Sequence, residues 1–375
     1  MLSGIFRDLS RGLSLAMLFL MLMLSGCYYS HLASGQFKLL WGRQPIAEVI
    51  DDPTQSEKVR TLLRLVEPVR HFAKNLGLRV DDQYTSFVDW PGDRIVTSLV
   101  RTRPGSLEAV PYSFPILGEL PYKGYFNQAL AEAEASRFRS EEGFDVCISP
   151  IRAYSTLGWF ADPVTRPMLA LGTAGLVESL FHELVHSTAF LPNAADFNES
   201  IAQFIGQQAT ILFFEEQPYH AEPSPITPER VRNSFADRRA IRRVMLAFRN
   251  RLAAIEKDSP QRALRDQLEA NARIELAALP LQTFDPKAVA AGARLSNACL
   301  ALYGTYADDL PRHAKLLNQL EGDLPALIRR LSHWAQTEQP AETFFDVDPG
   351  PAHSLKTPLN DPPVQPLHPE LSLGK

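Results

Sequence analysis

The sequence predicts an α+β fold, in which a mainly helical body stands beside a small β-sheet. Two patterns support this prediction. Residues 84–122 are rich in aromatic and β-branched side chains and are broken by prolines and glycines, which is typical of short strands joined by turns. From Gly175 onward, apolar residues recur at helical spacing through most of the chain. With 375 residues, 45% of them hydrophobic, the chain can bury a full-sized core.

The same patterns place the individual elements. Ahead of the strand-rich region, apolar residues at helical spacing predict one amphipathic helix at 56–76. After it, an alanine- and glutamate-rich segment at 127–142 predicts a helix that ends at Gly143. The remaining elements that we expect are strands at 145–150 and 154–160, and helices at 228–279 with a break at Ser259 and Pro260, at 286–306 and at 310–336.

The amino-terminal segment has the features of an export signal. Arg7 and Arg11 precede an apolar run at 13–24, which is too short to cross a bilayer core of about 30 Å as a helix. The run ends in Leu24-Ser25-Gly26-Cys27, which resembles the lipobox of bacterial lipoproteins, where the cysteine becomes the lipidated first residue after cleavage. We therefore expect a lipid anchor at Cys27. The alternative is an ordinary signal peptide followed by an incidental cysteine.

The anchor predicts where the protein works and what it meets. Tyr28, rather than an aspartate, follows the cysteine, which favours the outer membrane of a cell envelope, facing the periplasm. The net charge of -5 is spread along the chain, so nucleic acid is excluded as a partner, and no obligate protein partner is inferred. In an oxidising compartment Cys147 and Cys299 could form one disulfide, but their apolar neighbours favour two separate small core residues.

A His-Glu-x-x-His pattern gives the clearest prediction of chemistry. Residues four apart on a helix share one face, so His182 and His186 can direct imidazole nitrogens at a single metal ion. Glu183 is rotated by about 100° around the helix, beside the ion but outside its ligands, where it can accept a proton from an attacking water. The alternative is a chance match on a solvated helix, which a three-position pattern produces in roughly one protein in a hundred.

The next helix supplies the third ligand that a catalytic zinc site needs. Glu199 comes near the start of that helix, and the loop at 191–195 with its proline lets the two helices fold back on each other. The prediction is therefore one zinc ion, held between two packed helices by two histidines and this glutamate. Asp196 and Asn198 are candidates for hydrogen bonds that orient the imidazoles.

Several unusual strings also resemble a known family, the zinc-dependent aminopeptidase lipoproteins of proteobacterial envelopes. The resemblance covers about residues 27–217 and includes Tyr122-Lys123-Gly124-Tyr125-Phe126, Ala153-Tyr154-Ser155-Thr156-Leu157-Gly158-Trp159-Phe160 and Phe197-Asn198-Glu199-Ser200. It implies zinc at His182, His186 and Glu199, with Glu183 as the catalytic acid and base. The sequence departs from the family by lacking a cysteine pair near 112–118. It also has Gln203 where better-known enzymes of this type place an aspartate.

The function that we expect is zinc-dependent hydrolysis of peptide bonds, carried out as an aminopeptidase on a peptide substrate. Tyr154 is the first candidate to stabilise the oxyanion, with Tyr303 and Tyr306 as alternatives, although any of them could simply pack in the core. Glu178 could bind the free amine of the substrate. Two other functions fit the same site: an endopeptidase acting on envelope proteins or peptidoglycan stem peptides, and a non-catalytic zinc-binding scaffold.

These predictions divide the chain into three parts. Residues 1–26 are a lipoprotein signal peptide, and residues 27–336 are a zinc metallopeptidase domain. Eight of the 29 prolines follow residue 339, so residues 337–375 are predicted to be a proline-rich, disordered tail.

Overall fold

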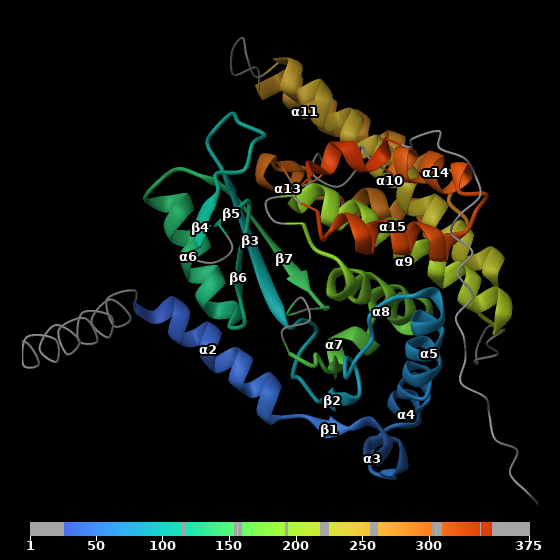
Figure 1. Ribbon diagram of the computed structural model, residues 1–375. Helices are drawn as coiled ribbons and strands as arrows, with labels where there is room; N and C mark the ends of the chain where they lie inside the picture. Colours follow the sequence, from blue (N-terminus) through green and yellow to red (C-terminus); the bar gives the residue numbers. More distant parts are fainter. Residues whose placement is uncertain are drawn as a thin grey trace, which may run out of the picture.

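The computed structural model describes residues 26–114, 118–153, 156, 160–191, 194–217, 225–255, 262–301, 303, 310–337 and 339–346. Within these residues, small sheets of two or three strands stand beside a larger helical body, so the predicted α+β class is confirmed (Figure 1). No helix in this part of the chain combines the length and the hydrophobicity that a membrane-spanning segment needs.

Among the described residues, the strands form three small sheets rather than one. In the first, β3 (Val96–Thr102) pairs antiparallel with both β6 (Lys123–Tyr125) and β7 (Asp145–Ile151), which confirms the strand predicted at 145–150. The others join β1 (Gln44–Pro45), β2 (Ser86–Val88) and β8 (Val164–Thr165), and β4 (Tyr112–Phe114) with β5 (Gly118–Leu120). The strand predicted at 154–160 lies mostly outside the described residues, and its described members Thr156 and Phe160 are not in a strand.

Helix α6 (Gln128–Ser140) packs against the β6-β3-β7 sheet and confirms the helix predicted at 127–142. Asn127 begins it by accepting a hydrogen bond from the Ala129 N–H. Gly143, with a φ of 70°, makes the left-handed turn that follows it. The buried side chains of α6 include Phe138, which belongs to the same hydrophobic cluster as Leu99 of the sheet.

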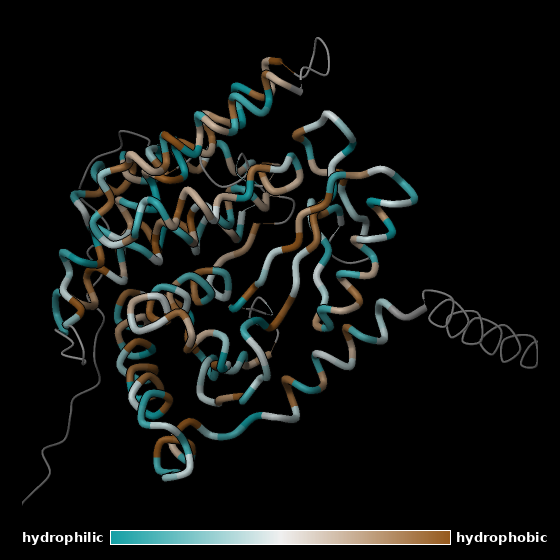
Figure 2. Tube along the Cα trace, turned by 180° about the vertical axis from the view of Figure 1, so that it is seen from behind, coloured by the Kyte–Doolittle hydropathy of each residue, from teal (hydrophilic) through white to brown (hydrophobic). Residues whose placement is uncertain are grey.

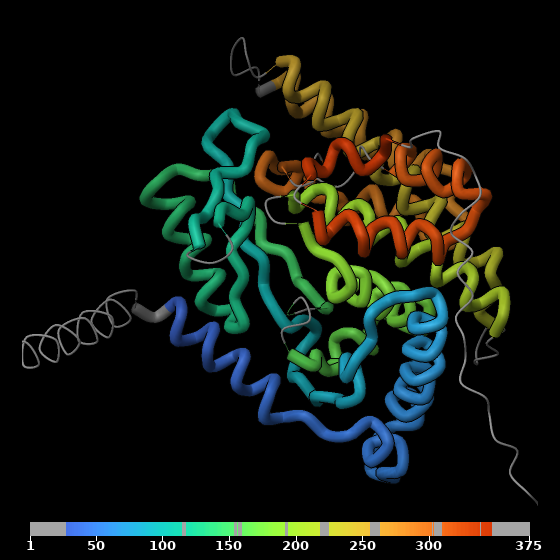
Figure 3. Tube along the Cα trace, viewed as in Figure 1, coloured from blue at the N-terminus to red at the C-terminus, as the bar shows by residue number. Residues whose placement is uncertain are grey.

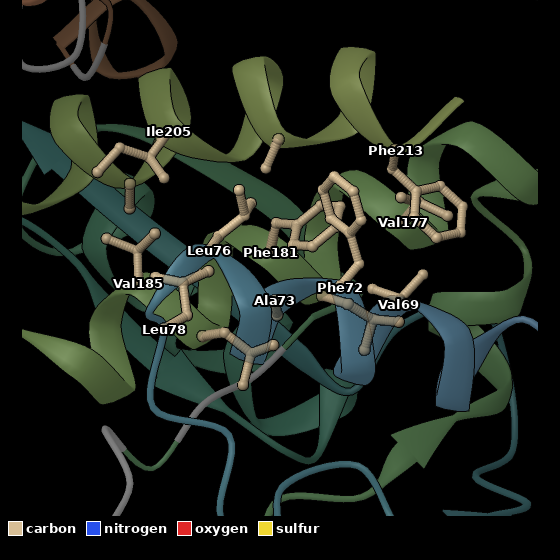
Figure 4. Packing of buried hydrophobic residues seen from close by; sticks show 14 of the residues in the cluster. Val69, Phe72, Ala73, Leu76, Leu78, Val177, Phe181, Val185, Ile205 and Phe213 are labelled. Atoms are coloured by element: carbon tan, nitrogen blue, oxygen red, sulfur yellow. The ribbon is translucent and has the colours of Figure 1, made fainter. Parts of the chain in front are cut away.

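Three helices, α5 (Val66–Leu76), α8 (Gly172–Thr188) and α9 (Ala195–Glu216), meet in the main hydrophobic core (Figure 4). One buried phenylalanine ring from each helix meets the other two, and these rings are Phe72, Phe181 and Phe213. The ring centroids are 5.5 Å apart for Phe72 and Phe213, 5.9 Å for Phe72 and Phe181, and 6.2 Å for Phe181 and Phe213. Burying such a ring contributes roughly 1.5–3 kcal/mol. This packing holds α8 and α9 side by side, and α8 carries the His-Glu-x-x-His segment.

Helices α10 (Pro228–Ile255) and α11 (Arg262–Ala277) form a second, smaller core with α12 (Pro286–Gly292). Hydrophobic and hydrophilic residues alternate along both long helices (Figure 2), and their apolar sides face each other through Leu252 and Leu276. The break predicted at Ser259 and Pro260 falls between α10 and α11, outside the described residues.

The helix predicted at 56–76 is in fact two helices, α4 (Glu57–Leu63) and α5. Pro68 explains the break, because its ring has no N–H for the carbonyl of Arg64 and collides with a helical carbonyl at that position. The proline is tolerated in the first turn of α5, where an N–H would lack a helical partner. Ser56 begins α4 by accepting a hydrogen bond from the Val59 N–H.

Two other predicted helices are also interrupted. The helix predicted at 286–306 divides into α12 and α13 (Asn297–Ala301), and Arg273 donates hydrogen bonds to the carbonyls of Ala290 and Ala293 at the division. The helix predicted at 310–336 divides into α14 (Leu310–Gln319) and α15 (Leu324–Trp334), because Glu321 and Gly322 have positive φ angles.

The remaining elements are α2 (Gly26–Trp41), α3 (Ile46–Asp51), α7 (Arg166–Leu169) and the 3-10 helix η1 (Ala341–Phe345). Helix η1 shows that the boundary predicted for the disordered tail, residue 337, is too early. Phe344 is fully buried, and its ring packs edge to face on Phe197 of α9, with centroids 5.1 Å apart. Residues 347–375 of the predicted tail lie outside the described residues.

Cys147 and Cys299 form a disulfide, so the expectation of two separate core residues is wrong. The bond joins β7 to α13 across 152 positions of sequence. Both cysteines have apolar neighbours, as the sequence indicated, and Tyr122 and Ala298 belong to the same small cluster. Apolar surroundings therefore did not distinguish a buried disulfide from two buried thiols.

Candidate metal centre

The α8–α9 hairpin brings the three predicted ligands to one point. His182 and His186 lie one turn apart on α8, and Glu199 lies near the start of α9. Asn198 closes the connection between the helices, since its side chain accepts a hydrogen bond from the Leu191 N–H and donates one to the Leu191 carbonyl. The turn therefore directs α9 back along α8, with the glutamate facing the histidines.

The side-chain donors of these residues converge. The Nε2 atoms of His182 and His186 are 3.1 Å apart. Glu199 Oε2 is 3.4 Å from His182 Nε2, and Glu199 Oε1 is 3.6 Å from His186 Nε2. Among the described residues, this is the one group of three His, Cys, Asp or Glu side chains with ligand atoms all within 4.8 Å of one another. The triad is compatible with one metal ion.

Charge and burial shift the pKa values of the triad in different directions. Burial alone would lower the pKa of His182, but its hydrogen bond with Glu199 and the nearby carboxylates raise it to about 9. Burial and the neighbouring His182 lower the pKa of His186 to about 4. Burial would raise the pKa of Glu199, but the two histidines hold it below its usual range. At neutral pH the Glu199 carboxylate and the free lone pair of His186 can therefore both bind a cation, whereas His182 must first lose its proton.

Glu183 lies on α8 between the two histidines and is 9% exposed. Burial raises its pKa to about 7; His182 opposes this shift, while Glu199 and Asp162 add to it. A carboxyl group with a pKa near neutrality can both accept and return a proton, which is what a general base and acid requires. It is also outside the ligand triad, so it remains available for that role.

Two buried residues near Glu183 were missed by the sequence analysis. Asp162 is 2% exposed and accepts hydrogen bonds of 2.8 Å from both the N–H and the hydroxyl of Thr156. Tyr84 donates its backbone N–H to the Asp162 carbonyl at 2.7 Å, and its buried hydroxyl has no partner among the described residues. Burial, Glu183 and Asp162 raise the pKa of Tyr84. These contacts join Thr156 and Asp162 to each other and to Tyr84, near the predicted base.

A third missed residue is Tyr122, which precedes β6 and packs near the disulfide. Burial raises its pKa to about 12, and Glu199 and Glu183 contribute to the shift, so its phenol lies within electrostatic reach of the triad and of the base. Tyr122 opens the Tyr-Lys-Gly-Tyr-Phe string that carries part of the family resemblance, and that string was the one signal in the sequence that could have drawn attention to it.

The tyrosines predicted from sequence do not take this place. Tyr154 and Tyr306 lie outside the described residues. Burial raises the pKa of Tyr303, but the charges near it are Arg242 and Arg294 rather than the carboxylates of the candidate metal centre. Among the described tyrosines, Tyr122 and Tyr84 have pKa values that the charge of Glu183 raises.

Other supporting roles predicted from sequence also differ. Glu178 accepts a hydrogen bond of 2.6 Å from Arg238, so its charge is already paired. Gln203 accepts one of 3.2 Å from Arg242. Asn198 holds the turn between the helices, as described above, instead of an imidazole.

The fold and the site together define a mainly helical α+β protein that builds one candidate metal centre on a His-Glu-x-x-His helix and the helix after it. A sequence model of the family described as "Putative aminopeptidase" matches residues 27–344, and the chain belongs to this family. The membership supports a peptidase. No curated protein and no solved structure matches the chain.

Proposed function

We propose that this protein is a zinc-dependent peptidase that removes residues from the amino end of peptides. The spacing of the three donors carries the proposal. Two ligands that each lie about 2.1 Å from a tetrahedral zinc ion are about 3.4 Å apart. The three separations in the triad are 3.1, 3.4 and 3.6 Å. Two imidazoles and a carboxylate are also a ligand set that catalytic zinc sites use, with one position left for water.

The residues of the chain divide the proposed reaction between them. His182, His186 and Glu199 would hold the ion, which when bound supplies a Lewis acid that polarises a carbonyl and acidifies a water. Glu183 would accept the proton of the attacking water and return it to the leaving amine. Tyr122 would donate a hydrogen bond to the oxyanion, since its phenol is protonated at neutral pH and lies within electrostatic reach of Glu183 and Glu199.

The amino-end specificity rests on the family. The pairing of Glu178 with Arg238 favours a second candidate, an endopeptidase, because it leaves that glutamate no free charge for the amine of a substrate. Envelope proteins and peptidoglycan stem peptides are the substrates to test for this candidate.

The decisive experiment measures zinc content and hydrolysis of a mixed peptide library by the purified chain and by Glu183→Gln. We expect one zinc ion in each protein. The parent should cleave peptides and shorten them from the amino end, and Glu183→Gln should not. Glu216→Gln is the matched control, since Glu216 is exposed near the end of α9. Internal cleavage would support the endopeptidase. Zinc without cleavage would indicate a non-catalytic scaffold, and a chain without zinc would refute the proposal.

We also propose that the chain is anchored in the cell envelope by a lipid on Cys27, with its body on the periplasmic side of the outer membrane. The Leu-Ser-Gly-Cys string supports this, and the family match begins at the same cysteine. The mass of the amino-terminal peptide from membrane-extracted protein tests it. An acylated Cys27 with residues 1–26 removed is expected, and an unmodified cysteine would contradict the anchor.

A further inference from the structure

Helix α2, the first helix of the described chain, is fixed to the body along one side. Tyr28 donates its hydroxyl hydrogen to the Gly124 carbonyl, and the His31 ring stacks on Tyr125 with centroids 5.3 Å apart. A Cβ on Gly35 would lie 2.2 Å from the ring of Phe126, so this glycine lets the helix approach closely. Leu39 completes the side and is 2% exposed. These contacts therefore fix the orientation of α2 about its own axis relative to the body.

The opposite side of α2 is exposed to solvent. Its members recur every three or four residues, which places them along one face, and we call them the outer face of α2: Ser30, Ala33, Ser34, Phe37, Lys38 and Trp41. Phe37 is 57% exposed and Trp41 is 79% exposed, and their rings stack on each other with centroids 5.1 Å apart. Large exposed aromatic side chains that lie together indicate a surface that contacts something else.

We propose that the outer face of α2 lies on the surface of a phospholipid bilayer, with Phe37 and Trp41 at the level of the lipid headgroups. The position of the helix supports a bilayer, because α2 starts at Gly26, directly after the apolar run at 13–24. Either a lipid on Cys27 or the apolar run itself would enter the membrane. In both cases the start of α2 is adjacent in sequence to the inserted part. The helix is about 24 Å long at 1.5 Å per residue, so it can extend along the membrane surface.

The composition of the outer face fits this occupant. Aromatic side chains concentrate at membrane interfaces, where an apolar ring and a polar edge are both accommodated. Helix α2 contains no Asp or Glu, and Lys38 is its one Lys or Arg, which suits anionic headgroups. Two aromatic side chains offer at most roughly 500 Å². A stable contact with a second copy needs about 800 Å² per partner, which these two rings do not supply.

A bilayer on this face would orient the whole body. Helix α2 packs beside β6 at the lower part of the molecule, and α11 lies at the top, both from the front (Figures 1 and 3) and from behind (Figure 2). The β6-β3-β7 sheet would therefore stand near the membrane, and α11 would stand away from it.

The test uses the full chain, purified from membranes and reconstituted in vesicles of phosphatidylethanolamine and phosphatidylglycerol. Ser34→Cys places a fluorescent label on the outer face without removing either aromatic ring. Ile274→Cys, on α11 and 67% exposed, is the matched control. Quenching is measured with iodide in the water and with a nitroxide carried on the lipid. The intact mass of the chain reports separately whether Cys27 is acylated.

We expect the lipid-borne quencher to act several times more strongly on the label at position 34 than on the label at position 274, and iodide to show the reverse. Adding Phe37→Ala and Trp41→Ala should return the label at 34 to water. A label at 34 that stays as accessible to iodide as the control overturns the proposal, with or without acylation of Cys27. Protection from iodide without quenching from the lipid identifies a second copy as the occupant and also overturns it.

Discussion

Gly206 of α9 lies directly against the backbone of His182 on α8. A Cβ at position 206 would be 3.3 Å from the His182 nitrogen and 3.4 Å from its Cα, tighter than most contacts of this kind. The absence of a side chain at this position lets the two helices approach closely at the first histidine. The spacing between His182 and Glu199 therefore depends on a glycine that is not a ligand.

Replacing Gly206 with alanine should weaken both the fold and the metal site. Alanine favours a helix by about 1 kcal/mol, but crowding a packed position costs about 1–3 kcal/mol, so we expect a net loss of up to about 2 kcal/mol. Separation of the helices should also reduce zinc affinity. Urea denaturation and zinc titration measure the two effects.

Gly292→Ala is the control for this change, because Gly292 ends α12 and a Cβ there would meet no atom within 4 Å. It should leave both measurements unchanged or raise stability slightly. Equal behaviour of the two variants would show that the contact at His182 does not limit the site.

Tyr122→Phe should slow catalysis without affecting zinc. Removing one hydrogen-bond donor to an oxyanion lowers kcat by about 100- to 1,000-fold, whereas the ligands of the ion stay in place. Steady-state kinetics measure kcat, and metal analysis measures the zinc content. Tyr303→Phe serves as the control, since Arg242 and Arg294 rather than the site carboxylates surround that hydroxyl. A similar small decrease in both variants would show that Tyr122 only packs against the disulfide cluster.

The part of the site that could be predicted from sequence is the part that lies within one helical hairpin. Helical spacing alone aligns His182 with His186, and a short loop returns Glu199 to them, as the structure confirms. Tyr84, Tyr122 and Asp162 come from outside that hairpin, and no local pattern shows which loops pack over a helix. The same limit applies to the Cys147–Cys299 disulfide, which depends on a contact across 152 positions.

The fold shows the same division between local and distant information. The spacing of apolar residues predicted where helices occur, but it missed breaks whose causes lie in single residues. Pro68 divides the helix predicted at 56–76, and the positive φ at Gly322 divides the one predicted at 310–336. Phe344 extends the body beyond the predicted boundary, because its burial depends on Phe197, far earlier in the chain.

Removing the proposed zinc ion with a chelator should lower the melting temperature of the protein. An ion present at 1,000 times its Kd stabilises the folded state by about 4 kcal/mol, which corresponds to roughly 6 °C for a domain of this size. Differential scanning calorimetry with and without a chelator measures the shift. His182→Ala should melt at one temperature under both conditions. His333→Ala, an exposed histidine on α15, should respond to the chelator as the parent does. An equal response of His182→Ala would place the ion elsewhere.

Asp237→Asn should destabilise the protein more at neutral pH than in acid. Asp237 is 4% exposed and accepts hydrogen bonds from the backbone N–H groups of Gln282 and Thr283. Burial would raise the pKa of Asp237, but these hydrogen bonds outweigh it and lower the pKa. The stabilisation is therefore complete above the unfolded-state pKa of about 3.9 and is lost as pH falls through the lower folded-state value.

We expect Asp237→Asn to cost about 1.5–3 kcal/mol at about pH 7, as for hydrogen bonds to a charged group. Urea denaturation at about pH 7 and about pH 3 should show the difference from the parent shrinking in acid. A difference that stays constant between the two conditions would mean that the charge of Asp237 does not contribute.

The Cys147–Cys299 bond also determines what a break in the backbone would do to the candidate metal centre. His182, Glu183, His186 and Glu199 all lie between the two cysteines in sequence, so the bond encloses the candidate metal centre in a covalent ring. A single cut anywhere in that ring leaves both pieces attached to each other. A nicked molecule would run as one band on a gel without reductant and as two bands with it, and it could keep its ligands assembled after the backbone has been broken.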